Sequence, residues 1–346
     1  MNATSCNELG RPDVVRGRWV QSDARATRLA HAVAHYVQGD SRDAACGHNA
    51  SRVFWSWTGV PSVPATSEAP FCAALRSLAP PNREGGVLFV GDSVSDQHAV
   101  TLAAQLNASY RPPYPGGGWR ICGNGRLVFK RNDFLTTALG PHGEECGGLR
   151  QPGSPDSDML SSRCSLTWSH RSFLKSYDVI IVNSGAHTIS DDAAFKVEME
   201  RAADALAQNA RPGALKVWRD LVPGVADCER SKFAPPLASL GDAEAWYARH
   251  PFFDGATFRR RNDVAAAIFA ARAGAARLHA FSPSIMRIDA HVGERATGGA
   301  IDCLHYCIPG PTMLWADLLT NRMIQAAGCA TNQRAAGPGK WHALRR

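Results

Sequence analysis

The sequence predicts an α/β fold with a central parallel sheet, because short apolar runs alternate with segments of helical periodicity. The clearest strand is residues 177–183, "YDVIIVN", and a helical pattern follows at 193–208. A second pair is the strand expected at 214–220, "ALKVWRD", and the helix expected at 263–276. Such alternation builds a parallel sheet with right-handed crossovers, and 346 residues can form it as one domain.

Residues 85–100, "GGVLFVGDSVSDQHAV", are the stretch around which these elements are organised. The apolar run at 87–90 predicts a buried strand, and Gly91 permits a sharp turn because it has no Cβ. Ser93 therefore lies where a strand ends and a helix begins, a place where α/β sheets bind ligands and negative charge is stabilised. The helix is indicated by apolar residues at helical spacing, namely Ala99, Leu102, Ala103 and Leu106. The alternative is that the aspartate and serine only cap this helix.

The remaining elements follow from composition along the chain. Residues 1–80 are rich in Pro, Ser and Ala, and we expect an irregular segment packed on the main domain by Trp19, Trp55 and Trp57, with a loop at 59–70. We then expect a loop at 108–125, a strand at 126–130, an insertion at 139–163 held by Cys146 and Cys164, a last strand at 277–283, a helix at 311–326 and a fraying tail from 328. The aromatic residues of the loop at 108–125 either stack on sugar rings or pack locally, namely Tyr110, Tyr114 and Trp119.

Ten cysteines are scattered through the chain without a Cys-x-x-Cys pair, so their spacing does not indicate a zinc site, and we expect no bound metal. An even number favours disulfides and an oxidising compartment, with buried free thiols in a reducing compartment as the alternative. Three N-glycosylation sequons, at Asn2, Asn49 and Asn107, point to the secretory pathway. Residues 1–10 do not form a signal peptide and no run of 18 apolar residues exists, so we expect no membrane anchor in this chain.

The formal charge of +7 is carried mainly by arginine. It does not indicate a nucleic-acid partner, because the chain has neither a Lys/Arg block nor a nucleic-acid-binding motif. The densest basic cluster, "FRRRND" at 258–263, is expected to be a solvated face. A basic surface also suits an acidic polysaccharide.

A second motif, "AIDCLHYCIPG" at 300–310, places Asp302 three residues before His305. In a helical turn these positions share a face, so the aspartate can orient the imidazole while the other ring nitrogen faces a serine. Cys303 and Cys307 flank the pair and are expected to clamp this loop. The chain order of serine, aspartate and histidine matches that of α/β-hydrolases, although Gly-Asp-Ser-Val-Ser differs from their Gly-x-Ser-x-Gly motif. A structural Asp-x-x-His pair is the alternative.

Together, "VLFVGDS" and "DCLHYCIPG" resemble the GDSL/SGNH hydrolase superfamily, and within it the PC-esterase branch that includes the plant trichome-birefringence-like polysaccharide O-acetyltransferases. Other blocks similar to this family follow in the right order over residues 6–325, namely "CNELGRPDVVRGRWV", "RLVFKRNDFL", "DVIIVNSGAH" and "SIMRIDAH". The resemblance implies an SGNH-type three-layer α/β/α sandwich with a central parallel sheet and a disulfide-bearing irregular N-terminal segment. The implied divisions are the segment 1–80, a catalytic domain at 81–327 and a basic tail at 328–346.

The resemblance also implies a catalytic site. Ser93 would be the nucleophile, His305 the general base and Asp302 the residue that orients it. The oxyanion hole would use the Ser93 N–H and the Asn183 amide, with Gly125 or Arg131 as candidates for a third donor. The alternative for Asn183 is a turn residue that ends a strand. Gly91, Asp92 and Gly185 would support the site, while Arg219, Arg287, Asp289 and His291 belong either to it or to structural ion pairs. One departure from the family is Met313, where the pattern Pro-Gly-x-Pro-Asp-x-Trp has an acid.

The implied function is transfer of an acetyl group to polysaccharide hydroxyls in the Golgi lumen through an acyl-enzyme. A carbohydrate O-acetyl esterase is the first alternative, because water can resolve the same intermediate. An inactive carbohydrate-binding protein is the second. We expect no bound cofactor, and the acetyl donor, acetyl-CoA or another, would enter as a co-substrate. The partners would be this donor and the polysaccharide acceptor.

Overall fold

The structure is a computed structural model that describes residues 16–21, 55–60, 63–110, 118–135, 144–145, 165–166, 168–184, 191–231, 234–252, 255–294, 301–308 and 310–336. Several features expected from the sequence lie outside these residues, namely Gly185, Tyr114, the sequons at Asn2 and Asn49, Cys146 and Cys164, and most of the insertion at 139–163.

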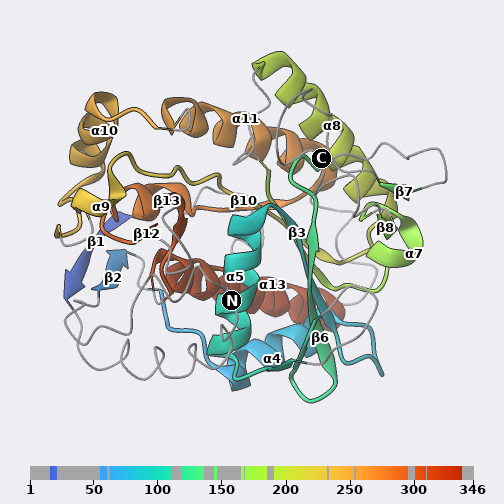
Figure 1. The fold of residues 1–346 in the computed structure, drawn as a ribbon. Helices are drawn as coiled ribbons and strands as arrows, with labels where there is room; N and C mark the ends of the chain where they lie inside the picture. Colours follow the sequence, from blue (N-terminus) through green and yellow to red (C-terminus); the bar gives the residue numbers. More distant parts are fainter. Residues whose placement is uncertain are drawn as a thin grey trace.

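A seven-stranded sheet with the order β11-β10-β9-β3-β6-β5-β4 forms the centre of the molecule (Figure 1). The strands from β11 to β6 pair in parallel, whereas β5 and β4 extend the sheet in antiparallel fashion. Their bounds are β3 Gly86–Gly91, β4 Ser109–Tyr110, β5 Trp119–Ile121, β6 Gly125–Arg131, β9 Val179–Val182, β10 Leu215–Arg219 and β11 Ala276–Leu278. The predicted α/β class with a mostly parallel sheet is therefore confirmed, and β4 and β5 replace part of the loop expected at 108–125.

The order in which the chain adds strands to the sheet reverses at β3. The chain passes from β3 to β6 on one side and later returns to β9 on the other side, so β3 separates the two halves of the sheet. Open α/β sheets bind ligands at such a switch point, beyond the carboxyl ends of the strands. Ser93, which follows β3, lies at this position.

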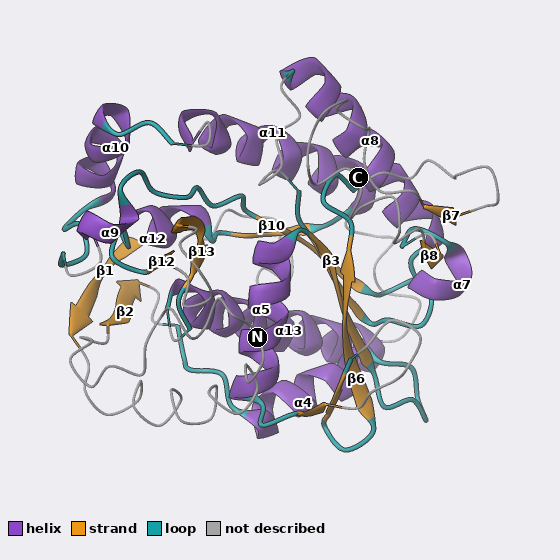
Figure 2. Ribbon diagram, viewed as in Figure 1, coloured by secondary structure: helices purple, strands orange, loops and turns teal. Residues whose placement is uncertain are grey.

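Helices cover both faces of the sheet (Figure 2). One layer consists of α4 (Glu68–Leu78), α5 (Ser93–Gln105) and α13 (Pro311–Ala336), and the other of α8 (Asp192–Asn209) and α11 (Gly255–Ala273). Val87 and Phe89 of β3 pack toward the first layer, whereas Leu88 and Val90 pack toward the second. Because both faces are buried, the strand is apolar throughout, as a covered parallel strand must be.

The N-terminal part is more regular than the sequence predicts. Strands β1 (Arg16–Gln21) and β2 (Trp55–Val60) pair in antiparallel fashion, with Trp19 opposite Trp57. Trp19 donates its indole N–H to the Pro283 carbonyl at 2.9 Å, which confirms its predicted anchoring role. The helix α4 belongs to the main core and is joined to the sheet by the Cys72–Cys122 disulfide. The boundary expected at residue 80 therefore falls after a core helix.

The C-terminal boundaries also differ from prediction. The strand expected at 277–283 splits into β11 and the short helix α12 (Phe281–Ile285). The helix α13 begins at Pro311 as expected but continues to Ala336, so a boundary at 327/328 falls inside a helix. The buried side chains of Ala327 and Cys329 explain why this part does not fray.

The basic cluster at 258–263 is only partly solvated. Arg259 and Arg260 are exposed, but Arg261 is buried and pairs with Asp192 of α8 at 2.9 Å. Asn262 is fully buried, and its amide bonds both the N–H and the carbonyl of Leu221. The cluster thus joins the helix layer to the end of β10, which corrects the prediction of a solvated face.

Short elements complete the fold, namely α7 (Arg171–Leu174), α9 (Cys228–Ser231), α10 (Leu240–Arg249), β7 (Glu144–Glu145), β8 (Ser165–Leu166), β12 (His291–Glu294) and β13 (Ile301–Tyr306). The strands β12 and β13 form a two-stranded antiparallel sheet of their own. No helix in the described part of the chain is long and apolar enough to cross a membrane.

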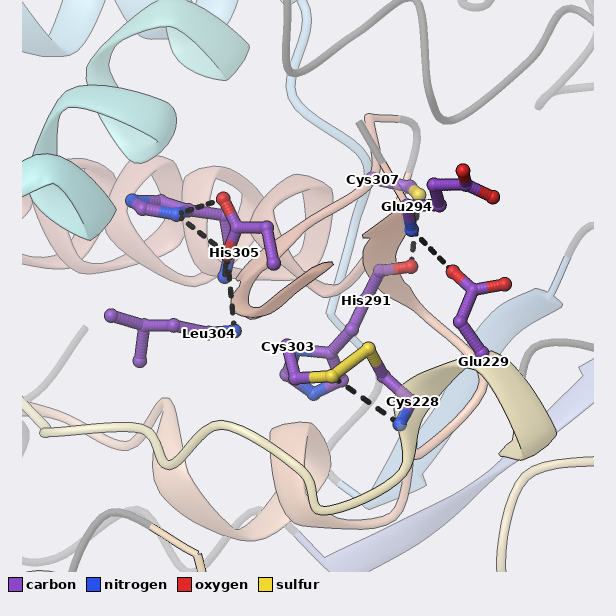
Figure 3. The surroundings of a disulfide bond; sticks show 9 residues. Cys228, Glu229, His291, Glu294, Cys303, Leu304, His305 and Cys307 are labelled. Atoms are coloured by element: carbon purple, nitrogen blue, oxygen red, sulfur yellow. Dashed lines mark hydrogen bonds and ion pairs between the residues drawn. A yellow bond between two sulfur atoms is a disulfide. The ribbon is translucent and has the colours of Figure 1, made fainter. Parts of the chain in front are cut away.

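All six described cysteines form disulfides, as expected for an oxidising compartment. Cys72 pairs with Cys122, and Cys228 pairs with Cys303. Cys303 and Cys307, which were expected to clamp the loop of Asp302 and His305, are both disulfide-bonded, and Cys303 joins β13 to α9 (Figure 3).

Candidate active site

Ser93 is held at the start of α5 by the two residues before it. The Asp92 carboxylate caps the helix and accepts the N–H groups of Val94 and Ser95 at 3.0 and 3.1 Å. A side chain at Gly91 would not fit, because a Cβ there would lie 2.4 Å from the Ser95 hydroxyl and 2.6 Å from the Asn183 carbonyl. This turn therefore both caps α5 and fixes the position of Ser93, which takes the first helical position, whose N–H has no partner within a helix.

The carboxyl ends of four parallel strands form a row beside this turn. Gly91 is in register with Arg131 of β6, and Val90 with Val182 of β9, so Asn183 follows next to Gly91. Val182 is in turn in register with Trp218, which places Arg219 beside Asn183. The structure therefore brings Arg131, Asn183 and Arg219 to the edge of the sheet that carries Ser93.

Asp302 and His305 lie on β13 and not in a helical turn, which corrects the prediction. Successive side chains of a regular strand alternate, so positions three apart would face opposite ways. The pairing of β13 with β12 shifts, however, because Gly293 is opposite Asp302 while His291 is opposite Tyr306. Extra residues on β13 form a bulge, and bulges re-aim side chains. The Asp302 carboxylate stabilises this bulge by accepting the N–H groups of Leu304 and His305 at 3.2 and 3.1 Å.

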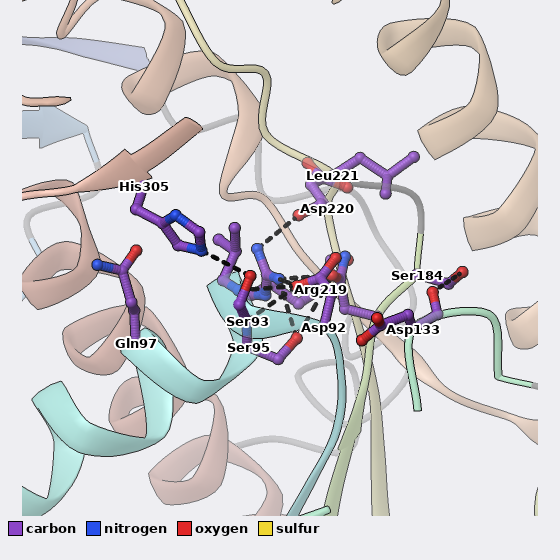
Figure 4. Close-up of polar contacts among 12 residues, drawn as sticks. Asp92, Ser93, Ser95, Gln97, Asp133, Ser184, Arg219, Asp220, Leu221 and His305 are labelled. Carbon is purple, nitrogen blue, oxygen red and sulfur yellow. Dashed lines mark hydrogen bonds and ion pairs between the residues drawn. The ribbon is translucent and has the colours of Figure 1, made fainter. Parts of the chain in front are cut away.

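The three predicted catalytic side chains form a continuous hydrogen-bonded chain. Figure 4 shows the part of it that joins His305 to Ser93. His305 Nδ1 lies 2.8 and 3.0 Å from the two Asp302 carboxylate oxygens, and His305 Nε2 lies 2.6 Å from Ser93 Oγ. Because a carboxylate can only accept, Nδ1 is the donor, and Nε2 is left to accept the serine proton. All three side chains are buried. This is the geometry of a serine activated by a histidine base.

Searches of protein-family models and of curated protein sequences found no match to this chain.

Asn183 lies at the site, but part of its amide is already used. Its Oδ1 accepts Arg219 Nη2 at 2.6 Å and the Ser95 hydroxyl at 3.4 Å, while its Nδ2 donates to the Arg219 carbonyl at 2.9 Å. These contacts fix the orientation of the amide. They engage one of its two N–H groups, so the second is the one that could serve an oxyanion.

The two candidates for a third oxyanion donor lie at opposite ends of β6. Arg131 is at the carboxyl end, where its guanidinium pairs with both oxygens of Asp133 at 3.0 Å. Gly125 begins the strand, and a Cβ there would contact the Glu84 and Gly85 carbonyls, at the edge of the sheet far from Ser93. The structure therefore does not bring Gly125 to the site.

Arg219 places a buried positive charge beneath the serine turn. Its Nη2 donates to Ser95 Oγ at 3.1 Å and lies 4.0 Å from the Asp92 carboxylate, and its guanidinium stacks over the Trp315 ring. Burial lowers the pKa of Arg219, and the carboxylates of Asp92 and Asp220 oppose this shift. A cation in a dry site favours the negative charge that forms when a serine attacks a carbonyl.

The other residues singled out in "SIMRIDAH" have structural roles. Arg287 forms a bidentate pair with Asp289 at 2.8 and 2.9 Å, and its guanidinium lies over the Trp19 ring. His291 of β12 is buried against Tyr306, and burial lowers its pKa to about 4. The ion-pair alternative thus holds for Arg287 and Asp289.

Sequence reasoning missed Gln97, whose side-chain amide bonds the backbone of Tyr306, the residue after His305. The signal that would have found it is its spacing, because Gln97 lies four residues after Ser93 on the same face of α5. Among the described residues, no group of three or more His, Cys, Asp or Glu side chains is arranged to hold a metal ion.

Proposed function

We propose that this chain is an O-acetyltransferase that moves an acetyl group onto polysaccharide hydroxyls through an acyl-enzyme on Ser93. The observation that carries the proposal is the chain of short contacts from Asp302 through His305 to Ser93 Oγ. A hydrogen-bonded histidine at 2.6 Å can take the serine proton as the oxygen attacks a carbonyl carbon.

The reaction divides into two balanced halves. In the first, the Ser93 oxygen bonds to the acetyl carbon, His305 takes the serine proton, and the donor's leaving group departs with that proton. In the second, a sugar hydroxyl attacks the acetyl carbon while His305 takes its proton. Ser93 Oγ then leaves and recovers that proton, so the enzyme returns to its starting state. Asp302 holds the imidazole in the required tautomer throughout.

The tetrahedral intermediates need hydrogen-bond donors for the oxyanion. We assign the Ser93 N–H and the second N–H of Asn183, because both lie at the carboxyl edge of the sheet. The buried charge of Arg219 supports the same polarity. Arg131 stays a candidate through its position at this edge, whereas Gly125 is dropped.

The choice of acetyl groups and polysaccharides rests on the resemblance of "VLFVGDS" and "DCLHYCIPG" to the SGNH and PC-esterase blocks. The mostly parallel sheet covered by helices is compatible with an SGNH-type sandwich. The disulfides and the exposed Asn107 sequon support passage through the secretory pathway, and we place the reaction in the Golgi lumen. The acetyl donor would be a co-substrate, acetyl-CoA or another activated acetyl compound.

Two alternatives use the same residues differently. A carbohydrate O-acetyl esterase would let water, and not a sugar hydroxyl, attack the acyl-enzyme. An inactive carbohydrate-binding protein has no need for Asp302, His305 and Ser93 at these distances, so their geometry argues against it.

The test is incubation of the protein with an acetyl donor and a panel of glycans, followed by mass spectrometry of the glycans and of free acetate. We expect acetylated glycan from the wild type and neither product from Ser93→Ala. Free acetate without acetylated glycan would identify an esterase. Full activity of Ser93→Ala, or an acetyl group mapped to another residue, would overturn the mechanism.

A further inference from the structure

The residues of the proposed triad belong to two separate structural units. Ser93 begins α5, directly after the central strand β3. Asp302 and His305 lie on β13, which pairs with β12 in a sheet separate from the central one. The register of the central sheet therefore does not determine how far His305 lies from Ser93.

Two further hydrogen bonds join α5 to β13, and both come from Gln97. Its Nε2 donates to the Tyr306 carbonyl at 2.7 Å, and its Oε1 accepts the Tyr306 N–H at 3.0 Å. The amide therefore pairs with this backbone as a neighbouring strand would. Gln97 is 6% exposed, so both bonds are shielded from water and fix the orientation of the amide.

The contact between Gln97 and Tyr306 lies directly beside the contact between Ser93 and His305. Gln97 is one helical turn after Ser93, and Tyr306 directly follows His305. Two adjacent points on β13 are thus held against two adjacent points on one face of α5. Tyr306 is fixed at its far end as well, because its hydroxyl donates to the Pro223 carbonyl at 3.0 Å.

We propose that Gln97 is a positioning residue that sets the distance between His305 Nε2 and Ser93 Oγ. This inference rests on the proposed function. Both hydrogen bonds of the Gln97 amide go to the Tyr306 backbone, so its loss should slow attack by Ser93 and leave substrate binding unchanged. A misplacement of about 1 Å in a catalytic pair costs roughly 10²-fold in rate.

The matched variants are Gln97→Met and Gln105→Met. Methionine has nearly the shape of glutamine but makes neither hydrogen bond. Gln105 lies on the same helix and directs its amide to the Met313 carbonyl of α13, away from β13. Gln97→Glu is the second variant: it keeps an acceptor for the Tyr306 N–H, loses the donor and turns a carboxylate oxygen toward the Tyr306 carbonyl.

The experiment measures the second-order rate of Ser93 labelling by a fluorophosphonate, which needs no acetyl donor or glycan. We expect Gln97→Met and Gln97→Glu to label roughly 10²-fold more slowly than wild type and Gln105→Met to be unchanged. With an activated acetyl ester, kcat should fall and KM should not. The low-field proton resonance of the His305–Asp302 bond should persist in Gln97→Met, because the β13 bulge holds both residues.

The outcomes separate the two proposals. If the wild type is not labelled at Ser93, the proposed function fails and the role of Gln97 fails with it. If the wild type is labelled and both Gln97 variants are labelled at the wild-type rate, only the positioning role is overturned. Loss of the low-field resonance together with labelling would show general disruption of the site and would also overturn it.

Discussion

At the scale of single residues, one side chain both stabilises the fold and is proposed to take part in the reaction. Asn183 is the proposed side-chain donor to the oxyanion, and its amide also joins the end of β9 to the backbone of Arg219. A counterpart with a purely structural contact is Asn262 of α11. Its amide bonds the N–H and the carbonyl of Leu221, just after β10. Both asparagines are almost fully buried, so comparing them separates the two roles.

We predict that Asn183→Ala lowers kcat by roughly 10² or more with little change in KM, because an oxyanion donor acts in the transition state. Asn262→Ala should lower the free energy of unfolding and leave kcat unchanged. Steady-state kinetics with an activated acetyl ester and denaturant unfolding measure both. An unchanged kcat for Asn183→Ala would assign it a structural role alone.

A second residue-scale prediction concerns the triad as a unit. Ser93→Ala should abolish the burst of leaving group, and His305→Ala should slow acylation by orders of magnitude. Adding His305→Ala to Ser93→Ala should cost almost nothing further, because triad members are strongly non-additive. Asp302→Asn should keep the fold and lose activity, since the imidazole would hold the wrong tautomer. Additive losses in pre-steady-state kinetics would contradict this unit.

The contacts among Ser93, His305 and Asp302 could be predicted from sequence because short motifs carry these residues. A third oxyanion donor could not be chosen from sequence, because Gly125 and Arg131 lie in the same short stretch, "GRLVFKR". Only the direction of β6 separates them, since a parallel sheet gathers carboxyl ends at one edge. Gln97 was missed because its partner is a backbone group, which leaves no trace in residue identity.

At the scale of elements, the β13 bulge is held from behind by the Cys228–Cys303 disulfide. Cys303 lies between Asp302 and His305 in sequence, and its carbonyl also accepts the Val225 N–H at 2.8 Å. The bulge was predicted as a helical turn because Asp-x-x-His has helical spacing. An irregular strand gives the same side-chain proximity, so spacing alone cannot separate the two.

We predict that Cys228→Ser with Cys303→Ser lowers both stability and activity, because the bulge loses its anchor to α9. The control is Cys72→Ser with Cys122→Ser, which opens a disulfide between α4 and the β5 turn. The sequence separations of 75 and 50 residues imply similar stabilisation, about 4 kcal/mol each in a chain-entropy model. The melting temperature should therefore fall in both double variants, while kcat/KM for an acetyl ester should fall only in the first. Equal kcat/KM values in the two double variants would show that the β13 bulge does not need the Cys228–Cys303 disulfide.

At the scale of the whole molecule, buried ionisable groups determine how stability depends on pH. Burial lowers the pKa of His279 and of His291 to about 4. Burial raises the pKa of Asp220 to about 6, against the opposing effect of Arg277. The unfolded chain binds more protons at the histidines and fewer at the aspartate, so the two kinds of group act in opposite directions.

We predict that the histidines make the protein less stable as pH falls from 6.5 toward 4, because the unfolded histidines gain protons first. Asp220 offsets part of this loss between pH 6 and 4, since the folded state binds its proton first. His291→Phe should therefore flatten the loss of stability on acidification, and Asp220→Asn should steepen it. Denaturant unfolding at several pH values measures both slopes, and slopes equal to wild type would contradict the burial argument.

The predicted oxidising compartment can be checked on the whole chain. Thiol titration of the denatured, unreduced protein should find few free thiols, because all six described cysteines form disulfides. Finding most thiols free would place the protein in a reducing compartment and remove the luminal part of the proposal.

The sequence predicted the parallel core well and the covering elements less well. The strands buried on both faces, such as Val179–Val182, have continuous apolar runs that are easily found. Helix ends such as that of α13 were misplaced, because burial of Cys329 and not local composition decides where the helix continues. The antiparallel pair of β1 and β2 was missed because it joins segments far apart in sequence.

The distance along the chain between Ser93 and His305 has a consequence during synthesis. The two residues are 212 positions apart, and Cys303 follows its disulfide partner by 75. At a synthesis rate of roughly 5–20 residues per second, the serine emerges about 10 to 40 s before its base. During that interval a nascent chain carries a serine that no histidine activates. The proposed activity would therefore begin only in molecules whose synthesis has passed His305.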